Sequence, residues 1–465
     1  MGGRAGGGRC PVTGVLDELT GAAVATDFGA LPPEVATRLT LLLADAVGCA
    51  LAGVTDPTAR RVAGLAASRF GTPTGVTALG VGTPVTPDMA AFVNGTALRA
   101  LELNDTYLGG EPVHPSDTVS AVLAAGELAG ASGATVLAGM AVAYETLCRL
   151  CANAAIRERG WDTVTFGALA TALGAGRVLG LDRDRLRDAV TVATVSAPAL
   201  WQTRVGELSA WKTSAFADAA RNGLFAALVA QTGIGGPPQA IDGPSGLERV
   251  VTGRLDLPDA AEWQTMRVRA KMFAAQYFTH PAIEACLRLR ETGLPAGSIR
   301  AVAVRTFGMA VTTAGTDRDK WAPANRETAD HSLPYCAAVA LLDGEVTPAQ
   351  FTDARLAADD VRALLPLVTV AEDPEATAGY PDTMATTVEV TLDGETRSAS
   401  VTRPLGDPRR GLTEADVAAK FLRCATASGL DHHATRRVLD LCLGVTGLDD
   451  IGVLLHAARD AAVPA

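Results

Sequence analysis

The sequence predicts a mostly α protein, with a large all-helical domain formed by both chain ends and a smaller α+β domain between them. Apolar residues recur at helical spacing over most of residues 33–232 and again after residue 412. Alternation typical of strands is confined to residues 299–402. The composition favours closely packed helices, because Ala and Gly dominate and only 5% of the 465 residues are aromatic.

The helices of the first half follow from their start signals and spacing. Pro33 opens a segment in which Val35, Leu39 and Leu43 recur at helical spacing, and the loop at Thr55–Pro57 ends it. Glycine-containing joints separate some of the later segments. Those further helices are expected at about 57–69, 88–103, 116–130, 134–152, 163–179, 183–196 and 213–232.

The strands come later in the chain. Ile299–Thr306 and Thr386–Leu392 alternate as strands do, and an Asp-Gly turn joins the second run to Thr396–Thr402, which predicts a hairpin. Helices are expected again at about 413–427 and 432–444. The predicted divisions are a flexible tail at 1–20, the helical domain at 21–266, the α+β domain at 267–405 and the return to the helical domain at 406–465.

Charge and composition exclude several classes of partner. The net charge is −11 and no run of Lys or Arg exceeds a pair, so nucleic acid is not expected as a partner. An anionic substrate would need cations that converge in one cleft to overcome this acidic field. No apolar run is long enough to cross a membrane and no signal peptide is visible, so no membrane partner is expected. The eight scattered cysteines suggest no disulfide framework and favour a cytoplasmic location.

Motifs for metals and nucleotides are missing from the sequence. Cys148 and Cys151 form a CxxC, but it lies within a helical pattern and has no second cysteine pair, so zinc is not expected. The sequence contains neither a P-loop nor a dinucleotide-binding glycine loop after a strand, and it has no G-x-S-x-G elbow. We therefore expect no metal and no cofactor.

Polar chemistry gathers at a few joints. His114 precedes Pro115, which holds it extended and outside a helix, where it could transfer a proton or contact a carboxylate. The alternative is plain helix capping at this joint. Lys212 lies at the start of an alanine-rich helix, where an ammonium opposes the helix dipole but suits a bound carboxylate. The alternative for Lys212 is an ordinary surface lysine.

Two further joints lie near the expected domain seam. Lys271 and His280 bracket an apolar stretch, and clefts between domains are common ligand sites. For His280, capping of the helix that starts at Pro281 is the stronger interpretation. Tyr335 precedes an apolar helix and could be either a core tyrosine or a hydroxyl presented to the cleft. The residues alone do not decide between these two.

Together these motifs resemble the MmgE/PrpD family over about residues 30–425. Singly they are weak, but their order and spacing are specific. The helix at 41–53, with its Asp-x-x-Gly-Cys-Ala-Leu-Ala-Gly ending, fits the same pattern. The other matching segments are Asn104–Tyr107, His114–Asp117, Gly160–Asp162, Trp211–Lys212, Ala219–Gly223, Lys271, Thr279–Ala282 and Asp330–Tyr335.

The resemblance implies a homodimer that works without metal or cofactor, with the α+β domain as a lid over the helical domain. It assigns active-site positions to His114, Lys212, Lys271 and Tyr335, and it places Asp105 and Thr106 at the same pocket. The decarboxylase branch usually carries Gly-Trp-His, so Asp162 here, like Arg204, favours the dehydratase branch. The expected catalytic set is His114, Asp105, Lys212, Lys271, Tyr335 and Asp162, with Thr106, Arg204, His280 and His331 binding substrate.

The expected activity is a cofactor-independent hydro-lyase that dehydrates 2-methylcitrate or a related alkylcitrate-type tricarboxylic hydroxy acid. Lys212, Lys271 and Arg204 would hold the carboxylates, and His114 with an aspartate would move the proton. Tyr335 could protonate the leaving hydroxyl. The alternatives are a decarboxylase of the cis-aconitate type, an epimerase or isomerase of a polycarboxylate, and a helical binding protein without catalysis.

Overall fold

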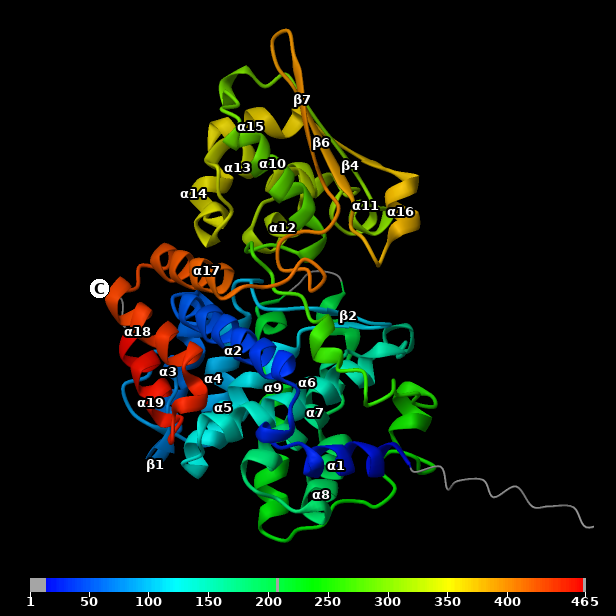
Figure 1. Ribbon diagram of the computed structural model, residues 1–465, viewed down its shortest axis with the longest axis vertical. Helices are drawn as coiled ribbons and strands as arrows, with labels where there is room; N and C mark the ends of the chain where they lie inside the picture. Colours follow the sequence, from blue (N-terminus) through cyan, green and yellow to red (C-terminus); the bar gives the residue numbers. More distant parts are fainter. Residues whose placement is uncertain (1–13, 206–208, 463–465) are drawn as a thin grey trace, which may run out of the picture.

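Figure 1 shows a computed structural model of the chain, which describes residues 14–205 and 209–462. Helices make up most of it, with a small sheet region, so the predicted mostly α class is confirmed. Most helices gather in the lower part of Figure 1, and the four-stranded sheet with its own helices lies above them. Two groups of buried apolar side chains form a core centred in each part.

Consecutive helices build the lower part. They are α1 (Val15–Ala25), α2 (Pro33–Gly53), α3 (Pro57–Arg69), α4 (Pro87–Arg99), α5 (Val119–Ala129), α6 (Gly133–Ala152), α7 (Val164–Val178), α8 (Arg183–Ser196) and α9 (Trp211–Gln231). A short strand, β1 (Gly71–Val76), follows α3. α7 packs against α6, α8 and α9. The approach is close, because a Cβ on Gly223 of α9 would lie 2.4 Å from the carbonyl oxygen of Ala168 in α7.

The end of the chain returns to the lower part. α17 (Glu414–Ala427) and α18 (His432–Leu443) pack against α2, and α19 (Gly452–Ala461) packs against α18. Figure 1 shows these last helices beside the first ones. The contact buries an ion pair, in which the Lys420 ammonium lies 2.5 Å from the Asp45 carboxylate and donates to the Leu103 carbonyl at 2.8 Å. The last helices therefore support a loop in the first half of the chain.

A helix occupies part of the segment predicted to be a flexible tail. α1 begins at Val15, packs against α6, α7 and α8, and buries Leu16 and Leu19. These leucines supply the apolar stripe that a surface helix needs for packing. The tail prediction for 1–20 is therefore wrong for residues 15–20, and residues 1–13 lie outside the described part of the chain.

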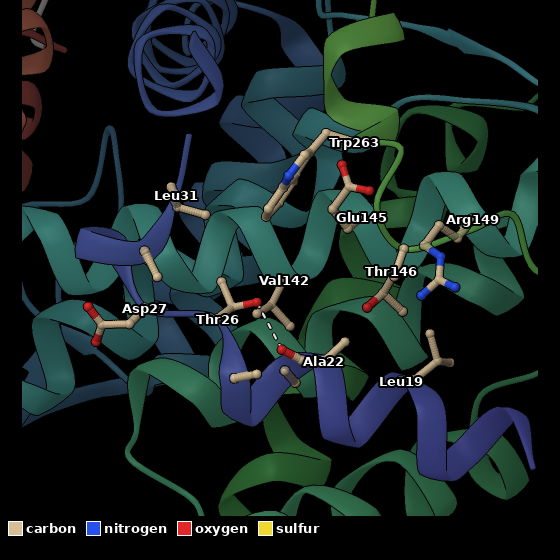
Figure 2. Close-up of a pocket in the computed structure, with 14 residues that line it drawn as sticks. Leu19, Ala22, Thr26, Asp27, Leu31, Val142, Glu145, Thr146, Arg149 and Trp263 are labelled. Atoms are coloured by element: carbon tan, nitrogen blue, oxygen red, sulfur yellow. Dashed lines mark hydrogen bonds between the residues drawn. The ribbon is translucent and has the colours of Figure 1, made fainter. Parts of the chain in front are cut away.

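A cavity of about 260 Å³ lies between α1 and α6 (Figure 2). The Glu145 carboxylate at this cavity accepts hydrogen bonds from the amides of Gln264 at 3.0 Å and Thr265 at 2.6 Å. Arg149 donates to the Pro258 carbonyl at 2.7 Å. The side chains of Glu145 and Arg149 thus hydrogen-bond to backbone groups of Pro258, Gln264 and Thr265, and they fix this segment to α6.

The upper part is a sheet covered by helices. Its strand order is β5-β4-β6-β7, with β5 parallel to β4 and the other pairs antiparallel. The strands are β4 (Ala301–Thr306), β5 (Val368–Glu372), β6 (Thr386–Thr391) and β7 (Thr396–Val401). The helices are α10 (His280–Glu291), α11 (Gly308–Ala314), α12 (Arg326–Ala329), α13 (Leu333–Asp343), α14 (Asp353–Leu356), α15 (Asp359–Leu364) and α16 (Pro374–Gly379). The predicted hairpin is confirmed, whereas the edge strand β5 was not predicted.

Two helices, α2 and α6, are long and apolar enough to cross a membrane by length and composition alone. In each of them, 83% of the most apolar stretch is buried inside the protein. That burial is typical of core helices, because an apolar surface on every side suits a protein interior as well as lipid.

Candidate active site

The loop after α4 shapes the site. α4 ends at Arg99, earlier than the sequence predicts, and Glu102 then adopts a φ of 49°, which is uncommon for a residue other than glycine. The side chain of Asn104 accepts a hydrogen bond from Arg99 at 3.1 Å and donates to Asp117 at 2.8 Å. These bonds fold the loop back and fix the direction in which Glu102 points.

A tight hairpin brings His114 back to this loop. The short strands β2 (Tyr107–Leu108) and β3 (Pro112–Val113) pair antiparallel. The turn between them lies against the end of α6, where a Cβ on Gly109 would be 2.8 Å from a backbone oxygen. A 3₁₀ turn then begins at Pro115, and His114 is extended, as its position before proline predicts.

His114 is held in one tautomer. Its Nδ1 lies 2.6 Å from the backbone carbonyl of Asp105, and a carbonyl only accepts, so Nδ1 carries the proton. Burial lowers the pKa of His114 well below its ordinary value, and the nearby Arg99 and Lys271 lower it further. The Nε2 atom therefore carries a free lone pair and can accept a proton.

We expect His114 to be neutral, protonated on Nδ1, at the pH where an ordinary histidine is half protonated, because its cationic form is disfavoured by burial and by two neighbouring cations. Long-range ¹H–¹⁵N NMR spectra of the imidazole nitrogens would show this tautomer directly. A His114 imidazolium pattern at that pH would contradict the assignment.

Asp105 acts from behind the cavity. Its carboxylate accepts hydrogen bonds from the Ser116 amide at 3.0 Å, the Ser116 hydroxyl at 2.6 Å and the Tyr144 hydroxyl at 2.8 Å. Burial raises the pKa of Asp105 to about 6, although these hydrogen bonds lower it. It does not line the cavity, so it acts on the site through the hydrogen bond that its backbone carbonyl accepts from His114. The predicted catalytic role of Asp105 is corrected to a positioning role.

Three cations converge on Glu102. Arg99 donates to its carboxylate at 2.9 Å, Lys271 lies at 3.2 Å and Lys212 at 3.5 Å. Burial alone would raise the pKa of Glu102, but Arg99, Lys271 and Lys212 together hold it well below its usual value. Burial lowers the pKa of Lys271. Three positive groups facing one carboxylate leave a local excess of positive charge in an acidic protein.

A second charged pair forms another wall. Arg204 donates to the Asp162 carboxylate at 2.9 Å, and the side chain of Asp162 is almost fully buried. Asp162 also accepts from the Val164 amide at the start of α7, at 3.2 Å. Its hydrogen bonds go to these groups and not to His114, so Asp162 orients Arg204. The predicted clamp Arg204 is thus already partly neutralised.

One cavity of about 550 Å³ brings most of the predicted residues together, at the seam between the two parts. The Nδ1 of His331 lies 2.5 Å from Asp330, and His331 reaches the cavity from the upper part. Across residues 14–205 and 209–462, no group of three or more His, Cys, Asp or Glu side chains could hold a metal ion. The predicted residues that line the cavity are Thr106, His114, Asp162, Arg204, Lys212, Lys271 and His331.

Tyr335 lies away from this cavity. Its hydroxyl is buried and donates to the backbone carbonyl of Gln350 at 2.5 Å, and its ring packs near Phe351. The expectation that Tyr335 presents its hydroxyl to the cleft is wrong, because a carbonyl inside the upper part holds that proton. The core-tyrosine alternative describes its position.

We expect Tyr335→Phe to keep kcat/KM within about twofold of the wild-type value, since the lost hydroxyl does not face the cavity. The free energy of unfolding should fall by about 1–2 kcal/mol, because the Gln350 carbonyl loses its buried donor. Steady-state kinetics and urea unfolding measure the two effects. A rate loss of about a hundredfold would return Tyr335 to the catalytic set.

His280 is also closed off from the cavity. Its ring is fully buried, with ring centres 5.2 Å from Phe273 and 5.1 Å from Tyr277, and Nε2 lies 3.2 Å from the Ala275 carbonyl. Burial lowers the pKa of His280 to about 3, with Lys271 adding to the effect. The predicted substrate-binding role is therefore wrong, and its side chain does not cap α10 either.

Sequence reasoning missed two residues at the centre of the site, Arg99 and Glu102. Both lie near the end of the helix predicted at about 88–103, and a charged residue at a helix end is usually solvated. The one available signal was that Glu102 lies two residues before the Asn104–Tyr107 motif. Only the fold shows that Lys212 and Lys271, far apart in the chain, meet the Glu102 carboxylate.

Comparisons with known proteins identify domain models and relatives that match most of this chain. The MmgE/PrpD N-terminal domain matches residues 17–258, and the MmgE/PrpD C-terminal domain matches residues 273–444. The 2-methylcitrate dehydratase of Cupriavidus necator is 30% identical over 399 residues, covering 79% of this chain and 81% of that protein. That of Salmonella typhimurium is 28% identical over 441 residues, covering 88% and 90%.

A third relative carries a different activity in its name. The cis-aconitate decarboxylase of Aspergillus terreus is 28% identical over 457 residues and covers 92% of each chain. The two domain matches together span most of the described helices and the whole sheet. The chain therefore belongs to the MmgE/PrpD family, and it is an enzyme of the lyase type.

Proposed function

We propose that this enzyme is a hydro-lyase that dehydrates 2-methylcitrate or a related alkylcitrate-type tricarboxylic hydroxy acid. The observation that carries the proposal is the meeting of Arg99, Lys212 and Lys271 beside a neutral His114 in one cavity. Relatives named 2-methylcitrate dehydratase support it. A cluster of cations suits a polycarboxylate, and a free imidazole lone pair suits proton removal next to a carboxylate.

The reaction requires one proton to be taken and another to be given. His114 Nε2 removes the proton from the carbon next to a carboxylate, and the electron pair forms the double bond as the C–O bond to the hydroxyl breaks. The hydroxyl leaves as water after it takes a proton. With Tyr335 outside the cavity, His331 is our candidate donor, because it lines the cavity and its contact with the Asp330 carboxylate at 2.5 Å orients its ring. Lys212 and Lys271 stabilise the developing charge on the carboxylate.

Decarboxylation is the alternative that a relative's name suggests. The decarboxylase branch of the family usually carries a histidine at the position where this chain has Asp162. The Asp162 carboxylate accepts a hydrogen bond from Arg204. This position therefore supplies no imidazole for decarboxylation. An epimerase would use the same base, because a base beside a carboxylate can return the proton to the other face.

Incubation with citrate, 2-methylcitrate, longer alkylcitrates and cis-aconitate separates these functions. New alkene absorbance without carbon dioxide release indicates dehydration, and gas release indicates decarboxylation. Exchange of solvent deuterium into substrate without a new alkene indicates epimerisation. Binding seen by calorimetry, with no product of any kind, would favour the non-catalytic alternative and end the proposal.

Lys212→Ala should lower kcat/KM for the preferred substrate by about tenfold to a hundredfold, the usual size for one charged hydrogen bond. Lys212 is 14% exposed in its side chain, so water partly replaces it. Steady-state kinetics measure the loss. Lys320→Ala is the matched control, since Lys320 does not line the cavity. Near-normal turnover of Lys212→Ala would remove this lysine from the mechanism.

The same proposal includes a homodimer, a cytoplasmic setting and a reaction without metal or cofactor. The lining cations supply the charge stabilisation that a metal supplies elsewhere. The described cysteines are all buried and unpaired, as suits a reducing compartment. Activity that survives dialysis against a chelator, and light scattering at the dimer mass, are the expected results.

A further inference from the structure

Part of the candidate active-site cavity is lined by side chains without formal charge. Phe278, Met309, Thr313 and Tyr380 line it, and we call these four residues the α11 wall. Met309 and Thr313 lie on α11, which packs against the turn that contains Phe278 and against α16, which precedes Tyr380. The cations and His114 come from the lower helices and the seam, so they belong to a different part of the fold than the α11 wall.

The shape of the α11 wall is fixed by aromatic packing. The Tyr380 ring stacks on Phe307 with centres 5.1 Å apart, and Phe278 meets Tyr380 edge-on at 6.1 Å. The Thr313 hydroxyl donates to the Met309 carbonyl at 2.6 Å, so its proton is held within the helix. The wall therefore offers rings, a methyl group and a thioether, and it offers few free donors to a polar ligand.

Met309 is unusually exposed for a large apolar side chain, with 43% of its surface accessible. Met309 lines the cavity, and no residue within 14–205 or 209–462 covers the exposed part of its side chain. An apolar group bound there would remove both surfaces from water. Methionine is unbranched and flexible, so it adapts to chains of different length.

The cavity is also large for a short acid. Its volume of about 550 Å³ falls within the range that holds drug-sized ligands. A citrate skeleton offers carboxylates for the cations but no apolar group for the α11 wall. We propose that the α11 wall binds an unbranched alkyl substituent longer than methyl on the substrate, and that Met309 sets the preferred chain length. This inference rests on the proposed function and narrows its substrate class to alkylcitrates with an extended chain.

Binding of inert analogues tests the wall without requiring turnover. Propane-1,2,3-tricarboxylate and its derivatives with chains from methyl to hexyl lack the hydroxyl and cannot be dehydrated. Calorimetry with the full chain should show Kd falling by about fourfold for each methylene until the chain outgrows the wall. The heat capacity change of binding should become more negative along the same series.

Two asparagine variants separate the wall from the rest of the helix. Met309→Asn should remove most of the gain with chain length and leave the Kd of the unsubstituted acid within about twofold. Thr312→Asn is the matched control, because Thr312 is an exposed neighbour on α11 that does not line the cavity. Met309→Trp should fill the space and move the preferred chain length toward methyl.

The outcomes distinguish this inference from the proposed function. If methylcitrate is dehydrated but Kd is independent of chain length, or if both asparagine variants behave alike, the α11 wall inference falls and the function stands. If chain length improves binding through Met309 but no alkylcitrate is dehydrated, the wall stands and the proposed function falls.

Discussion

Lys271→Met is expected to lower kcat/KM by about 10²–10³, the size found when one charge-stabilising donor is removed from an active site. Lys271 is almost fully buried and lines the cavity, and it donates to the Glu102 carbonyl at 3.1 Å and carboxylate at 3.2 Å. Because water cannot replace a buried ammonium, the loss should exceed that of the more exposed Lys212.

The Lys271→Met variant also shows whether this charge acts on substrate binding or on the transition state. Most of the loss should appear in kcat, because a cation that stabilises the developing carboxylate charge acts mainly in the transition state. Lys320→Met, which removes a lysine that does not line the cavity, should leave both constants unchanged. Circular dichroism and a thermal melt check that Lys271→Met is folded. A folded variant with wild-type kcat would remove Lys271 from the chemistry.

Lys420→Met should cost about 3–5 kcal/mol of unfolding free energy, the usual loss when one partner of a buried ion pair is removed. The two side chains are 3% and 1% exposed, so Asp45 would be left buried without its ammonium partner. The Leu103 carbonyl beside Glu102 would also lose its donor. Urea unfolding followed by fluorescence measures the change.

A paired variant separates stability from positioning. Lys420→Met with Asp45→Leu removes both charges, so most of the unfolding free energy should return. Activity should stay below wild type, because the Leu103 carbonyl still lacks the ammonium that fixes the loop before Asn104. If the free energy of unfolding of Lys420→Met lies within about 1 kcal/mol of the wild-type value, the ion pair contributes little to stability.

Local signals explain which parts of the fold the sequence predicted. Pro33 and Pro57 begin helices where expected, and Asp393 and Gly394 turn one strand into the next, because these choices depend on a few adjacent residues. The edge strand Val368–Glu372 pairs in parallel with β4, far away in the chain, and its alternation is limited to Val368–Val370, too short a run to predict a strand. Its existence depends on a partner that the sequence does not identify.

The residues of the site also divide into those that the sequence identified and those whose place only the fold shows. The resemblance identified His114, Lys212 and Lys271, and the fold places all three at one cavity. Glu102 was missed because its importance comes from cations on separate elements. Tyr335 was misplaced because the carbonyl of Gln350, in the 3₁₀ helix Pro348–Phe351, decides where its hydroxyl points.

The return of α17 onto α2 has a consequence for biosynthesis. A ribosome releases the segment containing His114 and Lys212 long before it releases Lys420, so a growing chain carries those groups while Asp45 and the Leu103 carbonyl still lack their partner. Catalytic competence therefore arrives late in translation, and nascent chains that stall before residue 420 hold an unfinished active-site loop.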